Sequence, residues 1–482
     1  MADDRFAFLS IRALGRMLRA GETTPTELAE YFLDRLDTVG RRFNAVVTLT
    51  RERAMDEART AERELASGHD RGPLHGIPWG AKDLLATAGG IPTTWGAAPF
   101  KDQQFDRDAA VVERLRAAGA VLVAKLGMVE LAGGMGYNQP NASLTGPGLN
   151  PWNAEAWSGG SSSGSGSAVG AGAVPFAIGS ETWGSITTPA SYCGVSGLRP
   201  TYGRVSRRGA MAFCWTLDKL GPMCRTADDC GLVLQAIAGH DPEDDTSLTL
   251  AYRYAPEQAR TGGFRLGLLA GATESVQPEV GRNFDAALDV LRTVATIEEV
   301  TLPDLPYGPV TETILRAEAA SAFDKFIRTG KASGLTAPED HAGGYAYSLV
   351  SAKDYLHALR IRRIIVRAVD ALFARYDAIV CPTTNAVASP ITTKFSDYFT
   401  TPGGRRPVIG AAGNVAGLPA ISVPNGFGER GLPTALQFVG RAGAENAILA
   451  AAHAYQERTD WHTKRPGIAL TPSPFPTGEG EM

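Results

Sequence analysis

The sequence predicts an α/β protein, and three observations support this fold class. Segments with helical periodicity alternate with short apolar, strand-like runs along most of the 482 residues. Two of these runs, 265–269 and 296–300, flank a helical segment at 277–292, a βαβ pattern that favours parallel strands. No period of 20–50 residues recurs, so a solenoid or a propeller is not expected. The length allows two or three average domains or one large α/β domain.

Local signals predict the elements in chain order. Thr24 and Pro25 mark the start of the first helix, at 25–38, because Thr caps helices and Pro fits the first turn. Thr226 likewise caps a helix at 227–238. Further helices are expected at 51–67, 108–115, most of 310–375, and 444–458. Strands are expected around Lys82 and at 120–125, 173–178, 376–383, 414–424 and 433–440, and 197–206 is expected to be a turn that enters a strand.

The composition excludes several classes of protein. A hydrophobic content of 44% and 20% charged residues are typical of a soluble globular protein. The net charge of −4 and the lack of a Lys/Arg-rich block give no signature for nucleic acid, and no apolar run is long enough to span a membrane. The five cysteines form no C-x-x-C pair, which indicates buried thiols. Without a signal-peptide pattern, we expect a cytoplasmic protein that uses neither a metal nor a cofactor.

The stretch at 157–190 is rich in Gly and Ser, yet it does not have the character of a linker. An apolar run at 173–178 separates two Gly/Ser clusters, whereas a flexible linker lacks such apolar order. Two loops of small residues joined through a buried segment bring backbone N–H groups and serine hydroxyls close together. This arrangement can form an oxyanion site with a nucleophile beside it.

A serine nucleophile in this stretch needs a base. Ser185 follows Gly184 at a turn, but none of the seven histidines lies in either serine loop. A lysine can serve as the base if burial lowers its pKa. Lys82 is the candidate, because Gly, Pro and Ile residues precede it in a short strand. The alternative is a lysine at a strand end with its ammonium in solvent.

Three motifs in this order resemble those of the amidase signature family, serine hydrolases that cleave amides with a Ser–cis-Ser–Lys triad. They are G-I-P-W-G-A-K-D at 76–83, G-G-S-S-S-G-S at 159–165 and the segment at 179–190. The resemblance covers about residues 10–460. It implies one large α/β domain over 1–465, with a central mixed, mostly parallel β-sheet covered by helices, and a Pro/Gly-rich tail at 466–482 that we expect to be disordered.

The resemblance also implies an amidase that acts on linear amides through an acyl-enzyme. Ser185 would be the nucleophile, Ser161 the proton relay in its cis peptide and Lys82 the neutral base. Esters or carbamates could follow the same chemistry. The oxyanion hole would consist of the N–H groups of Thr182, Trp183, Gly184 and Ser185.

Three positions depart from the family pattern. Glu181 stands for the usual Asp, and Thr187 stands for the usual Arg, which puts any supporting ion pair there in doubt. Trp183 replaces a Gly, so its ring either lines the acyl pocket or packs outward. Asp218 is interpreted as a structural carboxylate.

The substrate pocket is expected to draw on one segment before the serine loops and on Trp183. The candidates in that segment are Gly134, Met135 and Tyr137, and a loop at 347–355 or 385–400 would complete the wall. An apolar and aromatic lining favours a neutral or aromatic acyl group. We therefore expect a small-molecule amide substrate, no nucleic acid, no membrane and, at family level, a homodimer.

Two other interpretations remain open. Residues 160–164 spell G-x-S-x-G with Ser162 at the centre, but the segment before them is a poor strand, so the α/β-hydrolase elbow is not favoured. The chain also resembles the amidase-like component of a tRNA-dependent amidotransferase complex in every triad motif. That component usually carries an Asp seven positions before the Asn equivalent to Asn414, where this chain has Pro407, and this argues against glutamine as the substrate.

Overall fold

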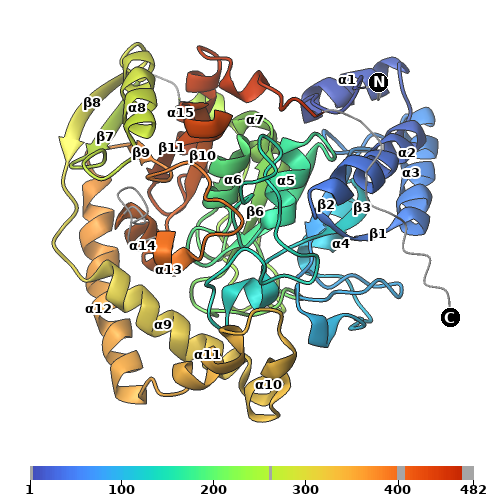
Figure 1. Cartoon of the computed structure of the whole chain (residues 1–482). Coiled ribbons are helices and arrows are strands. Elements are labelled where there is room, and N and C mark those ends of the chain that lie inside the picture. The colour runs from blue at the N-terminus through green and yellow to red at the C-terminus, as the bar shows by residue number, and fades with distance from the viewer. Residues whose placement is uncertain (1–3, 260–262, 399–407, 469–482) are drawn as a thin grey trace.

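The computed structural model describes residues 4–259, 263–398 and 408–468. Its centre is one sheet of eleven strands (Figure 1). In order across the sheet they are β1 (Val46–Leu49), β3 (Val121–Leu126), β2 (Pro78–Lys82), β4 (Phe176–Glu181), β6 (Lys219–Cys224), β5 (Ser196–Arg199), β10 (Ala420–Phe427), β11 (Pro433–Gly440), β9 (Ala378–Pro382), β7 (Phe264–Leu269) and β8 (Ala295–Val300).

Helices surround this sheet, and four of them form a group at its lower left in Figure 1, α9 to α12. The helices are α1 (Ile11–Ala20), α2 (Pro25–Arg35), α3 (Arg51–Ala66), α4 (Ala110–Ala117), α5 (Ser163–Gly170), α6 (Thr187–Cys193), α7 (Ala227–Ile237), α8 (Pro278–Leu291), α9 (Tyr307–Ala322), α10 (Asp324–Arg328), α11 (Asp340–Tyr347), α12 (Ala352–Leu372), α13 (Phe395–Tyr398), α14 (Val408–Val415) and α15 (Glu445–Gln456).

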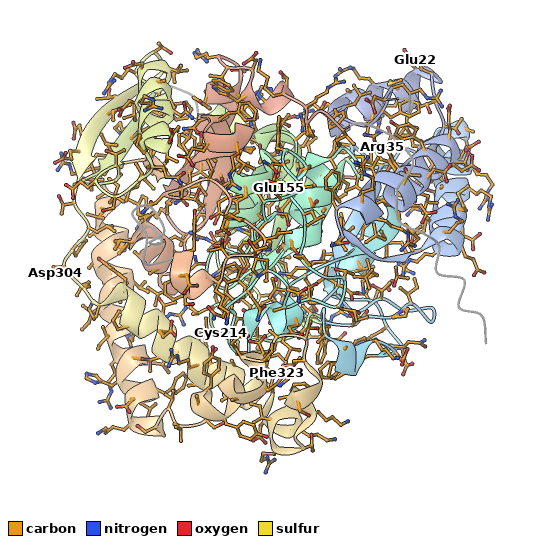
Figure 2. The ribbon with its side chains drawn as sticks, viewed as in Figure 1. Glu22, Arg35, Glu155, Cys214, Asp304 and Phe323 are labelled. Atoms are coloured by element: carbon orange, nitrogen blue, oxygen red, sulfur yellow. The ribbon has the colours of Figure 1, made fainter. Side chains whose placement is uncertain are left out.

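The sheet separates two apolar cores because successive strand side chains point to opposite faces. Along β4, Phe176 and Ile178 belong to one buried cluster, and Ala177 belongs to the other. Side chains pack densely on both sides of the sheet (Figure 2). Among the described residues, no helix combines the length and the apolar character that crossing a membrane requires. The cytoplasmic location stays a prediction.

The predicted α/β domain with a mixed sheet is confirmed, but the expectation that the sheet is mostly parallel is wrong. Among the described strand pairs, four are parallel and six are antiparallel. The βαβ unit β7–α8–β8 is parallel as predicted. The short connection between β10 and β11 makes those strands an antiparallel pair, and β5 and β6 also pair antiparallel to their neighbours. Residues 469–482 of the predicted tail lie outside the described part of the chain.

Several elements differ from the sequence-based expectation. At 197–206 the strand β5 comes first and the turn follows, because Pro200 has no N–H to continue the ladder. The start of the strand predicted at 414–424 is instead the end of α14. The helices α5 and α6 arise within the Gly/Ser-rich stretch, where propensity disfavours them.

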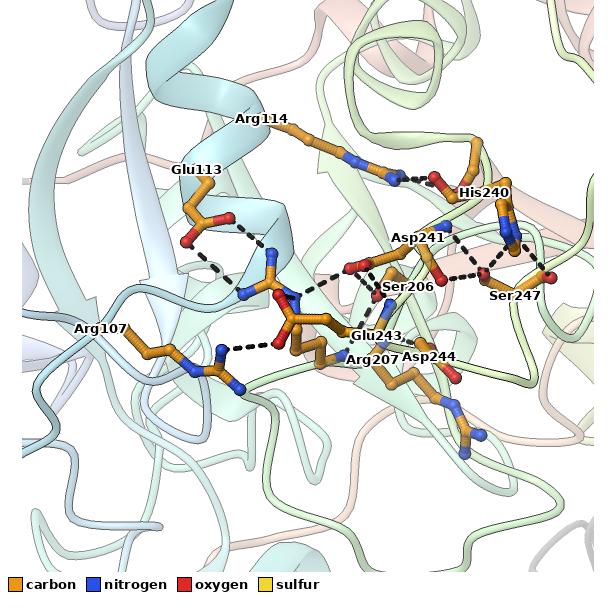
Figure 3. Close-up of polar contacts among 12 residues, drawn as sticks. Arg107, Glu113, Arg114, Ser206, Arg207, His240, Asp241, Glu243, Asp244 and Ser247 are labelled. Carbon is orange, nitrogen blue, oxygen red and sulfur yellow. Dashed lines mark hydrogen bonds and ion pairs between the residues drawn. The ribbon is translucent and has the colours of Figure 1, made fainter.

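The acidic loop at 241–245 is fixed by arginines from two other segments (Figure 3). Arg208 pairs with both Glu113 and Asp241, and Arg107 pairs with Glu243 at 2.7 Å. The Asp241 carboxylate also accepts a hydrogen bond from Ser206. This loop is therefore tied to α4 and to the segment after β5.

Candidate active site

Neighbouring parallel strands place the catalytic candidates at one edge of the sheet. Lys82 ends β2, and Ser180 lies near the end of the adjacent strand β4. The carboxyl ends of parallel strands meet at the same edge, which is the usual position of sites in α/β proteins. Ser161 lies just before α5, and Ser185 lies in the turn between β4 and α6. Residues from well-separated segments of the chain therefore converge here.

The amine of Lys82 is fully buried and contacts three serine hydroxyls. Its Nζ lies 2.8 Å from Ser161 Oγ, 3.0 Å from Ser162 Oγ and 2.9 Å from Ser180 Oγ. The peptide bond between Gly160 and Ser161 is cis. The alternative in which the lysine ammonium lies in solvent is therefore excluded by this geometry.

Hydrogen bonding distinguishes the hydroxyl of Ser162 from that of Ser161. Ser162 Oγ donates to the carbonyl of Ser180 at 3.2 Å and accepts from the N–H of the same residue. Its proton is thus engaged, so it can only accept from Lys82. A neutral amine has one lone pair, and Ser161 remains available to donate a proton to it. The proposed relay hydroxyl differs physically from its neighbour in this respect.

The surroundings of Lys82 favour the neutral amine. Burial lowers the pKa of Lys82 to about 7, although the negative charges of Asp218 and Glu181 raise it in part. A lysine with this pKa can accept a proton near neutral pH.

The turn that carries Ser185 is fixed by buried carboxylates at its two sides. Glu181 accepts hydrogen bonds from the N–H groups of Ile186 and Thr187 at 2.9 and 3.0 Å. Asp218 accepts from the hydroxyl of Thr182 and from two backbone N–H groups, which supports its interpretation as a structural carboxylate. The candidate oxyanion donors Thr182, Trp183, Gly184 and Ser185 lie between these anchors.

The ion pair questioned at Thr187 is supplied from another strand. Arg199 on β5 lies 2.8 Å from Glu181, and both side chains are fully buried. Asn414 also donates to Glu181, at 3.0 Å. Burial would raise the pKa of Glu181, but the charges of Arg199 and Lys219 and these hydrogen bonds hold it at about 2. The carboxylate that anchors the turn is therefore ionised.

A cavity of about 320 Å³ opens beside Ser185. Trp183 lines it and also packs against an apolar cluster, so the ring forms part of the cavity wall rather than pointing away. Tyr137 lies on the wall, whereas Gly134 and Met135 are buried and are not among the lining residues. The lining residues are Ala132, Gly133, Gly136, Tyr137, Thr182, Trp183, Ser185, Phe213, Glu312, Leu315 and Tyr347.

Sequence analysis missed several of these residues. Ser180 and Ser162 lie inside the motifs given above, so the signal was present, but their contact with Lys82 depends on how β2, β4 and α5 pack. Glu312 and Leu315 on α9 have no motif. In the part of the chain that the structure describes, no cluster of three His, Cys, Asp or Glu side chains could hold a metal ion.

Comparison with known proteins places this geometry in context. A family model described as Amidase matches residues 27–449. The chain is 38% identical over 504 residues to the A subunit of the Glutamyl-tRNA(Gln) amidotransferase of Moorella thermoacetica, covering 96% of this chain and 99% of that protein. A solved peptide amidase from Stenotrophomonas maltophilia is 31% identical with a TM-score of 0.84, covering 96% of this chain and 99% of that one. A structure described as an unexpected vestigial protein complex that reveals the origins of an s-triazine catabolic enzyme is 30% identical, with a TM-score of 0.85 and coverage of 93% and 98%.

These relatives correct one expectation from the sequence. The chain was predicted to act without nucleic acid and with at most a second copy of itself as a protein partner. That prediction is wrong, because the relative from Moorella thermoacetica and a second one from Chloroflexus aggregans, 39% identical, are both named as one subunit of an amidotransferase that is defined by a tRNA.

Proposed function

Since this chain belongs to the amidase family, we propose that it cleaves the C–N bond of a carboxylic amide as the amidase subunit of a tRNA-dependent amidotransferase. The catalytic part of this proposal rests on the buried amine of Lys82 with Ser161 at 2.8 Å, beside a cavity lined by Ser185. The assembly part rests on relatives that match nearly the whole chain. In this role the subunit releases ammonia from the side-chain amide of glutamine.

The proposed reaction begins with attack of Ser185 Oγ on the amide carbonyl carbon. As the new C–O bond forms, the Ser185 proton passes to Ser161, and the Ser161 proton passes to the lone pair of Lys82. The negative charge on the carbonyl oxygen is stabilised by the N–H groups of residues 182–185. The C–N bond then breaks while the proton returns through Ser161 to the leaving nitrogen, which leaves as ammonia. Water hydrolyses the acyl ester on Ser185 by the reverse proton route.

The cavity wall is compatible with an amino acid amide. Glu312 is the charged residue in its lining, and its Oε1 lies 2.8 Å and 2.7 Å from two nitrogens of the Arg316 guanidinium. A carboxylate in this position can attract the ammonium group of a substrate such as glutamine.

A second candidate substrate is a neutral or aryl amide. Four aromatic residues line the cavity, which suits an apolar acyl group. The replacement of the usual Asp by Pro407 also favours this substrate over glutamine; Pro407 lies outside the described residues. The lining residues involved are Tyr137, Trp183, Phe213 and Tyr347.

Ammonia release from L-glutamine and from benzamide distinguishes the two substrates. We would assay the full chain, both alone and in the assembly purified with it, and use Ser185→Ala as the control. Glutamine turnover by the assembly that disappears in Ser185→Ala supports the amidotransferase role. Faster turnover of benzamide than of glutamine, again lost in Ser185→Ala, supports the second candidate. Release that persists in Ser185→Ala refutes both.

A further inference from the structure

One exposed face of α12 has an unusual charge. The helix lies at the outer edge of the molecule (Figure 1), and side chains project from it away from the sheet (Figure 2). Lys353, Arg360, Arg363 and Arg367 are all exposed and recur at spacings of seven, three and four residues. At 3.6 residues per turn this spacing places them on one side of the helix. We call these four residues and the apolar residues between them the α12 face.

The cations of the α12 face have no carboxylate partners. Within the described ranges, none of its Lys or Arg side chains forms an ion pair. Elsewhere arginines are commonly paired, as Arg208 is with Glu113 and Asp241 in Figure 3. The acidic residues of α12 do not neutralise this face, since Asp370 pairs with Arg441 and Asp354 hydrogen-bonds to Ser351. A positive surface therefore persists on a chain whose net charge is −4.

The same face exposes large apolar side chains. Leu356 and Ile364 lie between the cations and are 54% and 57% exposed. Leu349, just before the helix, is 84% exposed, and Tyr345 on α11 is 50% exposed. A group of exposed apolar residues bordered by charged ones is typical of a protein–protein interface.

We propose that the α12 face binds an acidic, amphipathic segment of a partner protein. This inference rests on the proposed role of the chain as one subunit of an assembly. Acidic side chains of the partner would pair with Arg360 and Arg363, and its apolar side chains would cover Leu356 and Ile364. Charge complementarity of this kind sets specificity and association rate.

Two other occupants fit the α12 face less well. A second copy of this chain in a two-fold contact would place the same positive face against itself, which is repulsive. An RNA strand would pair with the cations, but Leu356 and Ile364 offer no aromatic surface on which bases could stack. The mixture of aliphatic and cationic side chains therefore favours an acidic protein segment.

The position of α12 links this face to the candidate site. The buried side of the helix packs on α9, which contributes Glu312 and Leu315 to the cavity wall. Arg362 donates to the carbonyl of Thr216, and Tyr355 donates to Glu318, whose carboxylate also binds Thr216. A partner on the outer face would thus lie on the helix that supports one side of the cavity.

The test uses the tagged full-length chain, purified at low salt from the cells that produce it. A zero-length carbodiimide reagent joins amines to carboxylates, so Lys353 reports which acidic segment lies against the face. The double variant Arg360→Glu/Arg363→Glu reverses the charge. Arg16→Glu/Lys101→Glu, at two exposed cations on other elements, makes the same change in net charge and is the matched control. Amide hydrolysis by the chain alone is expected to be unchanged in both variants.

The expected result is a cross-link from Lys353 to an acidic segment of a co-purifying protein. We expect affinity to fall by roughly tenfold or more in Arg360→Glu/Arg363→Glu and to remain in the control variant. A partner that binds the double variant normally, or cross-links elsewhere, overturns this inference alone. Nuclease-sensitive RNA released by the double variant, or a cross-link from Lys353 to a second copy, also overturns it. A single chain with no partner in native mass spectrometry overturns both the inference and the proposed role in an assembly.

Discussion

The pKa of Lys82 makes a direct prediction for the pH dependence of catalysis. The proposed base must be neutral, and burial lowers the pKa of this amine from 10.5 to about 7. At pH 7 about half of the molecules would therefore carry a neutral amine, against roughly one in three thousand for a lysine with its ordinary pKa. We expect kcat/KM to rise with pH through a single ionisation near pH 7 and to level off above pH 8.

The assay is the initial rate of amide hydrolysis from pH 5 to pH 9 at low substrate concentration, where the profile reports ionisations of the free enzyme. Lys82→Arg replaces the base with a group that stays protonated, and we expect it to abolish the reaction. The same shift has a stability consequence. The folded state disfavours the protonated amine, so this penalty is fully present below pH 7 and disappears as pH rises from about 7 to 10.5. Lys82→Met should accordingly unfold at a higher temperature at pH 6 while it lacks activity.

A second buried lysine provides the matched control. Lys219 is also fully buried, burial lowers its pKa to about 7, and among the described residues its Nζ has no hydrogen-bond partner. It does not contact the serines that surround Lys82. In Lys219→Met we expect the midpoint of the pH profile to stay near 7. If the midpoint vanishes in that variant, or if Lys82→Arg retains the wild-type profile, the assignment of the base is wrong.

Three further predictions follow from the site. Ser161→Ala should lower kcat/KM by roughly a factor of 10³, while Ser165→Ala, a buried neighbour that does not contact Lys82, should stay near wild type; equal effects in the two would contradict the relay. Glu181→Gln breaks a buried ion pair and should lower the free energy of unfolding by about 3 kcal/mol, whereas Asp37→Asn at an exposed pair should cost less than about 0.5 kcal/mol, as urea unfolding would measure. Trp183→Gly enlarges the cavity, so the ratio of kcat/KM for bulky over small amides should increase, and an unchanged ratio would exclude the ring from substrate selection.

Much of the fold could be predicted because local patterns agree with it. The capped helices α2 and α7 and the βαβ unit β7–α8–β8 carry their signals in short windows of sequence. The sheet order and the antiparallel pairs depend on contacts between distant segments, which no local window reports. The helices α5 and α6 form because they are buried among small residues. A Cβ at Gly164 would come within 2.5 Å of the backbone of Gly127, so only glycine permits this packing.

The site was predictable to a similar extent. The motifs identified Lys82, Ser161 and Ser185, because each catalytic group lies within a short run of characteristic residues. Arg199, which pairs with Glu181, could not be inferred from Thr187, since strand pairing brings it in from another segment. The exposed cations of α12 are visible in the sequence, but their lack of ion-pair partners becomes visible only when the other charges are placed.

Reaction with a fluorophosphonate probe tests the central claim most directly, because the reagent forms a covalent bond with an activated serine. We would treat the full chain, digest it and locate the adduct by peptide mass. The account predicts one adduct on Ser185, absent in Ser185→Ala and formed more slowly in Lys82→Ala. An adduct on Ser162, or labelling of Ser185 that is equally fast without Lys82, would contradict the Ser–Ser–Lys site.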